Sequence, residues 1–479
     1  MKSLDKEILR LALPSILANI TVPLVGMVDI AVAGHLHGSG ALGAAEYIGG
    51  ISVGALILNV IYWCFAFLRA STGGLTAQAF GRKDRADADS ILGQSLALAL
   101  ASALLLLVLQ WPLSRVGLLF ADSTPDVAGL ALRYFFIRIW AAPATLCLMS
   151  FKGWFIGMQD SVSSMAADLV VNAVNIAASI ILTLGIGNWE GLGFDGIALG
   201  TVVAQYSGLA FAVCICIFKY KVRILPVGLL RRGKRAPITP QGGASEHSPL
   251  LTTPSQLTGR GANGFRRLLS LNGNLFTRSI CFTGIYLGFT IIASRYGATL
   301  LACANIMMNL LMIFSYFTDG FAYAGEALTG RFIGAGDREM TKRTVRQVFA
   351  WSMGVAVLWM LIYLAAGMPL LRFMTDDSTV VEACREFLPW LIAMPLLGCA
   401  AFTWDGIYIG ATAARGIRDA MIAALAAFLA SWFVCKAAFS PEGPAAIHLL
   451  LGAYFMHLVA RTVWLSARYG KDVLGAVPE

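Results

Sequence analysis

The chain has 479 residues, of which 58% are hydrophobic and only 13% are charged. Its mean hydropathy of +0.72 excludes a soluble enzyme or binding domain of this size, which would need a far more polar surface. The net charge of +9 lies mostly in segments between apolar runs, so it indicates membrane topology and not nucleic-acid binding. The composition therefore predicts an all-α integral membrane protein.

The apolar runs are continuous, and each is long enough to cross a bilayer, which takes ~20 residues of helix. Twelve spans are expected near residues 8–34, 45–72, 88–110, 131–157, 162–187, 194–218, 275–296, 301–333, 347–372, 381–411, 418–438 and 444–466. Residues 219–267 are first basic and then rich in Pro, Gly, Ser and Thr, which is typical of a flexible linker. The predicted organisation is an N-terminal lobe (1–218), a cytoplasmic linker (219–267) and a C-terminal lobe (268–479), with six spans in each lobe.

Basic residues gather before the first span and after the second, sixth, eighth and tenth spans. They are Lys2, Lys6, Arg10, Arg82, Lys83, Arg85, Lys219, Lys221, Arg223, Arg338, Lys342, Arg343, Arg346, Arg415 and Arg418. Because cytoplasmic loops are enriched in Lys and Arg, both termini are expected in the cytoplasm. The N-terminus runs directly into the first span without a small-residue cleavage site, so we expect no removable signal peptide.

The two halves share short motifs at a constant spacing. TAQAFGRKD at Thr76–Asp84 and TGRFIGAGD at Thr329–Asp337 have Thr, Gly and Asp in common, 253 residues apart. FIG at 155–157 and YIG at 408–410 have the same spacing. Since six spans separate the copies, the halves have the same orientation, as in transporters that handle substrate between two parallel repeats.

The first span carries one carboxylate, Asp29, and two prolines, Pro14 and Pro23. A charge at membrane depth costs ~2.5–3.5 kcal/mol on insertion scales, so an acid there is a candidate functional residue. Asp29 could take up a proton, pair with Na⁺ or a cationic substrate, or form a structural hydrogen bond to a neighbouring helix. Each proline removes a backbone donor and can bend the span, either as a static kink or as a moving hinge.

Polar side chains of the fifth and sixth spans are candidates for the same site. Asn172, Asn175 and Ser179 follow one another at three and four residues, which places them on one helical face, and Thr201 lies in the sixth span. Their oxygens could coordinate a small cation or accept a hydrogen bond from a protonated acid. Hydrogen bonding between helices is the alternative interpretation.

The C-terminal half has its own buried acids. Asp319 and Glu326, seven residues apart, share a face of the eighth span, and Asp405 lies in the tenth. Neighbouring buried acids repel unless one holds a proton or a base is close. Candidate bases are Arg69, Lys152 and Arg278. The acids form either a second proton site or an ion-pair network.

Motifs of other functional classes are absent from the sequence. It contains no nucleotide-binding glycine loop and no hydrolase or zinc-protease motif, and the five histidines lack the spacing of a metal site. The nine cysteines lie mostly in apolar runs, as buried hydrophobic residues do. We therefore expect neither an enzyme nor an ATP-driven pump, with no cofactor beyond a coupling H⁺ or Na⁺.

Three segments resemble the multidrug and toxic compound extrusion (MATE) family, in particular its subfamily of DNA-damage-inducible proteins. They are LALPSILANITVPLVGMVDIAVAGHL at Leu11–Leu36, DGFAYAGEALTGRFIGAGDR at Asp319–Arg338 and WDGIYIGATAARGIRDAM at Trp404–Met421. The resemblance covers nearly the whole chain apart from the linker. It implies two six-helix lobes arranged as a V. It also implies a functional monomer that lies among the lipids of a bacterial inner membrane. Such a protein would export drugs or organic cations in exchange for entering H⁺ or Na⁺.

The resemblance also implies residue roles. Asp29 matches the coupling acid of the first span, and Pro14 matches a proline linked to its bending. Asn175 and Thr201 match an N-lobe cation site, at which Na⁺ could bind together with Asp29. Where some members have a second Asp, Ser179 stands here, which favours H⁺ over Na⁺.

The alternative is a flippase for lipids or lipid-linked oligosaccharides of the same superfamily. The bases Arg69, Lys152 and Arg278 support that reading, because a basic cavity suits phosphate groups, whereas Asp29 opposes it.

Overall fold

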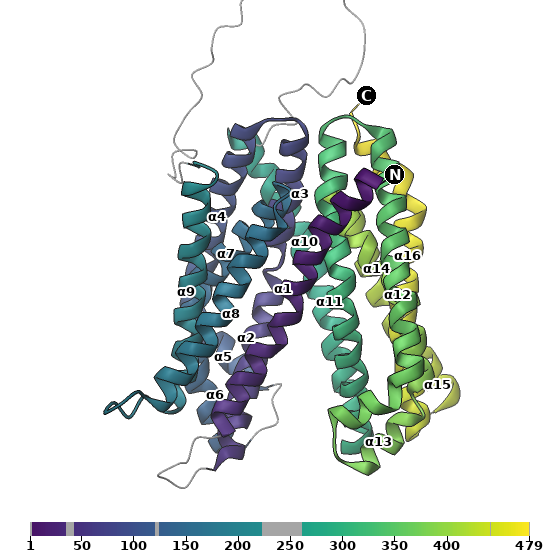
Figure 1. Ribbon diagram of the computed structural model, residues 1–479. Helices are drawn as coiled ribbons and strands as arrows, with labels where there is room; N and C mark the ends of the chain where they lie inside the picture. Colours follow the sequence, from purple (N-terminus) through teal and green to yellow (C-terminus); the bar gives the residue numbers. More distant parts are fainter. Residues whose placement is uncertain (1, 35–42, 120–123, 223–260, 441, 479) are drawn as a thin grey trace, which may run out of the picture.

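The computed structural model describes residues 2–34, 43–119, 124–222, 261–440 and 442–478, and these are almost entirely helical (Figure 1). Twelve of the described helical segments are long and apolar enough to cross a membrane. The predicted fold class and number of spans are therefore confirmed.

The N-terminal lobe contains nine helices among its described residues. They are α1 (Lys2–Gly34), α2 (Ala44–Cys64), α3 (Phe67–Gly81), α4 (Arg85–Val108), α5 (Gln110–Leu119), α6 (Pro125–Arg138), α7 (Ala142–Gly157), α8 (Ser161–Leu184) and α9 (Phe194–Phe218). Helices α2 and α3 together form the second span, and α6 and α7 form the fourth through the 3₁₀ turn Ile139–Ala141. Pro143 at the start of α7 lacks a backbone donor, which accounts for this interruption.

The C-terminal lobe contains seven α-helices among its described residues. They are α10 (Gly261–Ala293), α11 (Ala298–Gly334), α12 (Arg338–Met374), α13 (Ser378–Arg385), α14 (Leu388–Gly410), α15 (Ala414–Phe439) and α16 (Pro444–Asp472).

Several predicted boundaries differ from the observed ones, and two of these differences change the predicted organisation. The tenth span begins at Leu388 and not near 381, because α13 is a separate short helix and Pro389 favours a new helix start. Helix α10 begins at Gly261, inside the segment predicted as linker. Most of the predicted linker, residues 223–260, lies outside the described residues.

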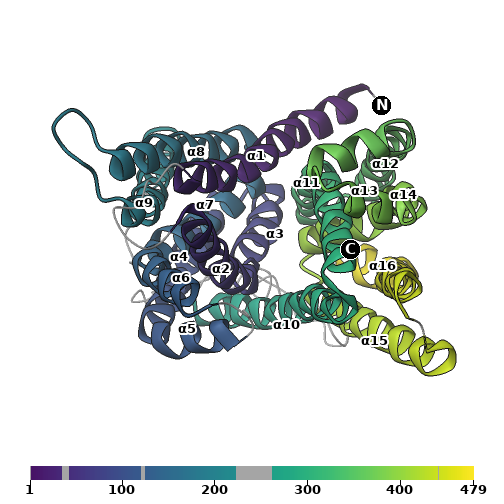
Figure 2. The same ribbon diagram turned by 90° about the horizontal axis from the view of Figure 1, so that it is seen from below.

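The two lobes form a V in which α1 crosses from one lobe to the other (Figures 1 and 2). We call the end where α1 begins and α16 ends the termini end, and the opposite one the far end; the lobes diverge toward the far end (Figure 1). Helix α1 packs against both α11 and α8. Its first half forms an apolar cluster with the C-terminal lobe, in which Ile8 and Ile16 meet Phe321 and Ala324.

The internal repeat is visible in backbone detail. Lys83 and Gly336, 253 residues apart, both have a positive φ (60° and 74°), and the next residues, Asp84 and Asp337, cap the following helices α4 and α12. The lobes also meet by matched close contacts at the termini end. A Cβ at Gly81 would overlap the carbonyl oxygen of Arg331, and a Cβ at Gly334 would overlap that of Gln78. Gly81 corresponds to Gly334, and Gln78 to Arg331, each 253 residues further along the chain. The two contacts are therefore equivalent, and the lobes are related by an approximate twofold axis.

Polar contacts reinforce the closed termini end. The Gln78 amide donates to the carbonyl oxygen of Gly410 at 3.0 Å, and the Gln159 amide donates to that of Ala327 at 2.7 Å. Arg331 also pairs with Glu7 of α1 at 3.1 Å. The lobes are therefore closed on one another at the termini end and diverge at the far end.

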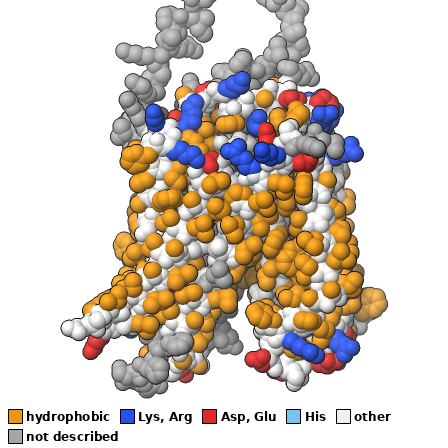
Figure 3. All heavy atoms as spheres, viewed as in Figure 1, with side chains coloured by type: hydrophobic (Ala, Val, Ile, Leu, Met, Phe, Trp, Pro, Cys, Tyr) orange, Lys and Arg blue, Asp and Glu red, His pale blue; other side chains and the backbone are white. Residues whose placement is uncertain are grey.

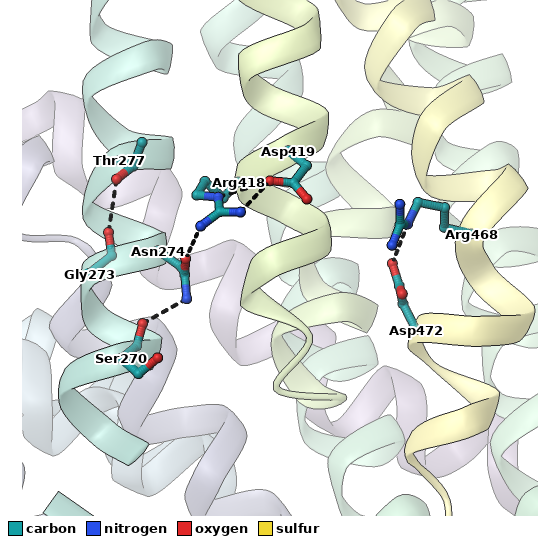
Figure 4. A network of polar contacts seen from close by, with 8 residues as sticks. All are labelled: Ser270, Gly273, Asn274, Thr277, Arg418, Asp419, Arg468 and Asp472. Carbon is teal, nitrogen blue, oxygen red and sulfur yellow. Dashed lines mark hydrogen bonds and ion pairs between the residues drawn. The ribbon is translucent and has the colours of Figure 1, made fainter. Parts of the chain in front are cut away.

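Basic side chains gather at the termini end, above a broad apolar belt (Figure 3). Some of them form polar networks there between helices of the C-terminal lobe (Figure 4). Arg418 of α15 donates to the Asn274 side-chain oxygen of α10 at 2.8 Å and pairs with Asp419 at 2.7 Å. Arg468 and Asp472 pair at 3.1 Å on α16.

Candidate transport sites

The first candidate site surrounds Asp29, near the far end of α1. The carboxylate is only 4% exposed and accepts a hydrogen bond from the Ser179 hydroxyl of α8 at 3.2 Å. Burial of a carboxyl group in a membrane-spanning region is costly, and one neutral donor compensates only part of that cost. Asp29 is therefore a group whose charge can respond to its surroundings.

The other polar residues predicted for this site lie on the neighbouring turns. Asn175 is one turn from Ser179 on α8, and its amide donates to the Thr201 hydroxyl of α9 at 3.0 Å. The amide oxygen of Asn175 is buried without a hydrogen-bond partner among the described residues. Asn172 instead donates to Thr21 of α1 at 2.6 Å, so it links α8 to α1. The structure thus brings Asn175, Ser179 and Thr201 together with Asp29, while their roles stay predictions.

Sequence reasoning missed a base in this lobe, Arg138 of α6. Its guanidinium donates to the Tyr134 hydroxyl at 2.9 Å and interacts electrostatically with Asp29. Arg138 also borders a cavity of about 230 Å³ that Thr201 and Tyr62 help to line. The sequence did contain a signal for Arg138, because a charged residue inside the apolar run YFFIRIW is a candidate functional residue. Asp29 therefore shares its lobe with a fixed positive charge.

Both prolines of the first span lie inside a helix that continues through them. Each lacks the N–H that would bond to the carbonyl four residues earlier. Between them, Ser15 and Thr21 bond back to the carbonyls of Leu11 (3.0 Å) and Ala18 (2.7 Å), a pattern that often accompanies bent helices. Bending at Pro14 or Pro23 stays a prediction.

The second candidate site is a cavity of about 300 Å³ where the C-terminal lobe faces α2 and α3. Its ionisable lining comes from α3, α10, α11, α14 and α16, and includes Arg69, Arg278, Asp319, Tyr323, Glu326, Asp405 and Arg461. The three acids predicted for the C-terminal lobe therefore border one cavity.

The candidate bases pair with three different acids. Arg69 pairs with Glu326 across the two lobes at 3.0 Å, and its guanidinium carbon lies 4.3 Å from the centre of the Tyr323 ring. Arg278 pairs with Asp405. Lys152 pairs with Asp168 of α8, an acid that sequence reasoning had not singled out.

Arg461 of α16 was also missed, although it stands in the apolar run LVARTVWL. Its side chain is 2% exposed, and it pairs with the same carboxylate, Asp405, as Arg278 does. Asp319 has no hydrogen bond or ion pair to any residue that the structure describes, although it interacts electrostatically with the surrounding arginines. The cavity thus contains a carboxylate shared by two arginines and one carboxylate without a direct partner.

Two repeated lobes, each with six described membrane-spanning segments and with charged side chains buried between them, define a multi-pass helical transporter. The family model MatE matches residues 14–181 and 275–435, one segment in each lobe, and the chain belongs to the MatE family. The family resemblance of the sequence motifs is therefore confirmed.

Relatives and solved structures agree with this assignment. The chain is 32% identical to DNA damage-inducible protein F of Escherichia coli K12 over 428 residues, which are 89% of this chain and 85% of that protein. It is 23% identical to the probable multidrug resistance protein NorM of Thermotoga maritima, with 79% and 74% of the two chains covered. It shares the fold of a multidrug resistance MATE family transporter in an outward-facing conformation, with a TM-score of 0.80, 14% identity and coverage of 99% and 97%.

Proposed function

We propose that this protein exports organic cations and other drugs by antiport, driven by inward flow of H⁺. The observation that carries the proposal is Asp29, a buried carboxylate on α1, which packs against helices of both lobes. A change in the charge of Asp29 would act where α1 joins the two lobes. Rearrangement of the lobes there would open the substrate path to one side of the membrane or to the other. The multidrug resistance names of the NorM relative and of the structural neighbour support the export of drugs.

The proposed cycle begins with Asp29 ionised and the lobes closed at the termini end. A proton that enters from the far end neutralises Asp29 and weakens its attraction to Arg138. Helix α1 then bends near Pro14 or Pro23, the N-terminal cavity shrinks, and the drug leaves at the far end. Release of the proton on the opposite side resets the transporter.

Two features of the N-terminal site favour H⁺ over Na⁺. A monovalent metal ion needs several oxygen ligands and is stabilised by negative charge. Here Ser179 supplies a neutral hydroxyl beside Asp29, and Arg138 places a positive charge within electrostatic reach. A proton needs no such shell of ligands, so Asp29 alone can carry it.

The proposed orientation follows from the basic residues at the termini end (Figure 3). Loops rich in Lys and Arg stay in the cytoplasm, so the termini are cytoplasmic and the far end faces outward. The protein would act as a monomer in a bacterial inner membrane.

The proposal is tested by dye efflux from proteoliposomes that contain the purified protein. A pH gradient and a Na⁺ gradient are imposed separately, with ethidium as the reporter. Efflux with the pH gradient alone supports the proposal, and efflux with Na⁺ alone would replace H⁺ by Na⁺ as the coupling ion. If neither gradient moves the dye but labelled lipid crosses the bilayer, the protein is a flippase.

A Ser179→Asp variant is expected to acquire sensitivity to Na⁺. The new carboxylate would lie beside Asp29 and near the unpartnered Asn175 oxygen, which completes a site with two charged ligands. The measurement is dye efflux under a Na⁺ gradient, with Ser179→Asn as a control of similar size. Equal Na⁺ responses of the two variants would show that the added charge creates no Na⁺ site.

A further inference from the structure

Two cysteines of the C-terminal lobe meet near the far end of the molecule. Cys303 lies in the second turn of α11, and Cys384 lies near the end of the short helix α13, 81 residues further along the chain. Both residues are 0% exposed and belong to the same apolar cluster. In the structure both are free thiols, and the proposed transport cycle uses neither of them.

The two thiols are in direct contact. Each is a side-chain hydrogen-bond partner of the other. The Cys303 thiol also donates to the backbone carbonyl oxygen of Val380 at 3.5 Å. Val380 precedes Cys384 by four residues, so the two lie one turn apart on the same face of α13. Cys303 therefore packs against the face of α13 that carries Cys384, and small side-chain movements would bring the sulfur atoms to bonding distance.

Helix α13 lies at the surface of the far end (Figure 1). The side chains of Glu382 and Arg385 are 70% and 65% exposed, whereas Val380, Val381 and Cys384 are buried against the lobe. Charged side chains are costly in the lipid core, so exposed charges place a helix in the aqueous region outside it. The buried face of α13 therefore carries its cysteine at the edge of the membrane.

We propose that Cys303 and Cys384 form a disulfide bond outside the cytoplasm, which fastens α13 to the outer end of α11. The inference rests on the orientation given in the proposed function, in which the far end faces outward, and not on the export of drugs. Disulfides form and persist in the periplasm, whereas thiols in the cytoplasm stay reduced.

The bond forms by thiol–disulfide exchange with an extracytoplasmic thiol oxidase that carries a disulfide of its own. One thiolate attacks the disulfide of the oxidase to give a mixed disulfide, and the second thiolate then displaces the oxidase. Two S–H bonds are lost and one S–S bond forms, while the oxidase takes up two protons and two electrons and leaves as a dithiol. Because both sulfur atoms are buried in the folded lobe, the exchange takes place before α13 docks on α11.

The bond would fix a helix that is too short to be stable alone. Helix α13 has eight residues, and isolated helices shorter than ~12–15 residues are marginal in water. It connects α12 to α14, which are the ninth and tenth spans. The disulfide would therefore stabilise the outer end of the C-terminal lobe, with a rise in melting temperature of roughly 5–10 °C.

The test compares full-length protein purified from cells that have a periplasmic thiol oxidase with protein from cells that lack one. Free thiols are alkylated in denaturant without reduction, and linked peptides are identified by mass spectrometry. The first preparation is expected to yield a peptide pair that joins Cys303 to Cys384, and the second is expected to yield none. Free thiols at both positions in the first preparation, or a link from either one to another cysteine, would overturn the proposal.

Variants separate the bond from the packing of the side chains. Cys303→Ser removes one sulfur with little change in size, so its melting temperature is expected to be the same in both preparations. Cys399→Ser is the control, because Cys399 is another fully buried cysteine of the same cluster. This control should keep the linked peptides and the difference in melting temperature. A difference that persisted in Cys303→Ser would contradict the proposed stabilisation.

Failure of the proposed function gives different results. Linked peptides without gradient-driven efflux of any dye would defeat the export proposal and leave the disulfide in place. The orientation is checked with Glu442→Cys, an exposed position between α15 and α16, and a membrane-impermeant maleimide added to spheroplasts. Labelling there together with free thiols at Cys303 and Cys384 would refute the disulfide alone, whereas absence of labelling would refute the orientation and the disulfide together.

Discussion

Replacement of Asp29 by Asn is expected to reduce gradient-driven dye efflux to the level of protein-free liposomes. The amide is similar in size to the carboxyl group and can still accept the hydrogen bond from Ser179, so the variant should fold. It cannot bind or release a proton, and it has no charge to interact with Arg138. The measurement is efflux under a pH gradient, with equal amounts of reconstituted protein.

The matched control is Asp195→Asn. Asp195 lies in the first turn of α9 and pairs with the exposed Arg133 at 2.6 Å. Among the described residues, neither of them has a hydrogen bond or ion pair with Asp29, whose partner is Ser179. This variant undergoes the same chemical change and should transport as the wild type does. If Asp29→Asn retained wild-type efflux, the coupling site would have to be sought among the acids of the C-terminal lobe.

Replacement of Gly81 by Val is expected to shift the protein away from the state closed at the termini end. A side chain at this position of α3 would overlap the carbonyl oxygen of Arg331 on α11, which belongs to the other lobe. Overpacking of a tight contact costs ~1–3 kcal/mol, which changes the ratio of two states by roughly fivefold to 150-fold. The variant should lose efflux while a cysteine placed at the termini end becomes more reactive to a water-soluble maleimide.

Gly93→Val on α4 provides the control, because a side chain there would meet nothing within 4 Å. The two variants share the same change in helix propensity, so that effect cancels in the comparison. Unchanged cysteine reactivity in Gly81→Val would argue that the lobes do not separate at this contact during the cycle.

Local patterns sufficed to predict the spans and the face of α8 that carries Asn175 and Ser179, whereas the role of these residues stays a prediction. Continuous apolar runs set the twelve spans, and helical periodicity placed Asn175 and Ser179 on one face of α8. In the structure, Asn175 bonds to Thr201 of α9, and Ser179 bonds to Asp29 of α1. A polar face on a membrane helix is stable only against polar neighbours. The contacts of α8 with polar residues of other helices could therefore be expected from its sequence.

Pairing of charges could not be predicted in the same way. Arg69, Lys152 and Arg278 were equivalent candidates in the sequence, yet each pairs with a different acid. The choice depends on how each helix is rotated against its neighbours, which the packing of the whole lobe determines. Arg138 and Arg461 were missed for the same reason, because an isolated arginine in an apolar run does not reveal what it faces.

The crossing of α1 between the lobes has a consequence for how the protein is made. Ile8 and Ile16 of the first helix pack against Phe321 and Ala324 of α11, which the ribosome produces only after the whole N-terminal lobe and α10. The first half of α1 therefore lies in the membrane without its final partner, α11, for most of translation. Membrane insertion of this helix comes first, but its docking is among the last steps of assembly.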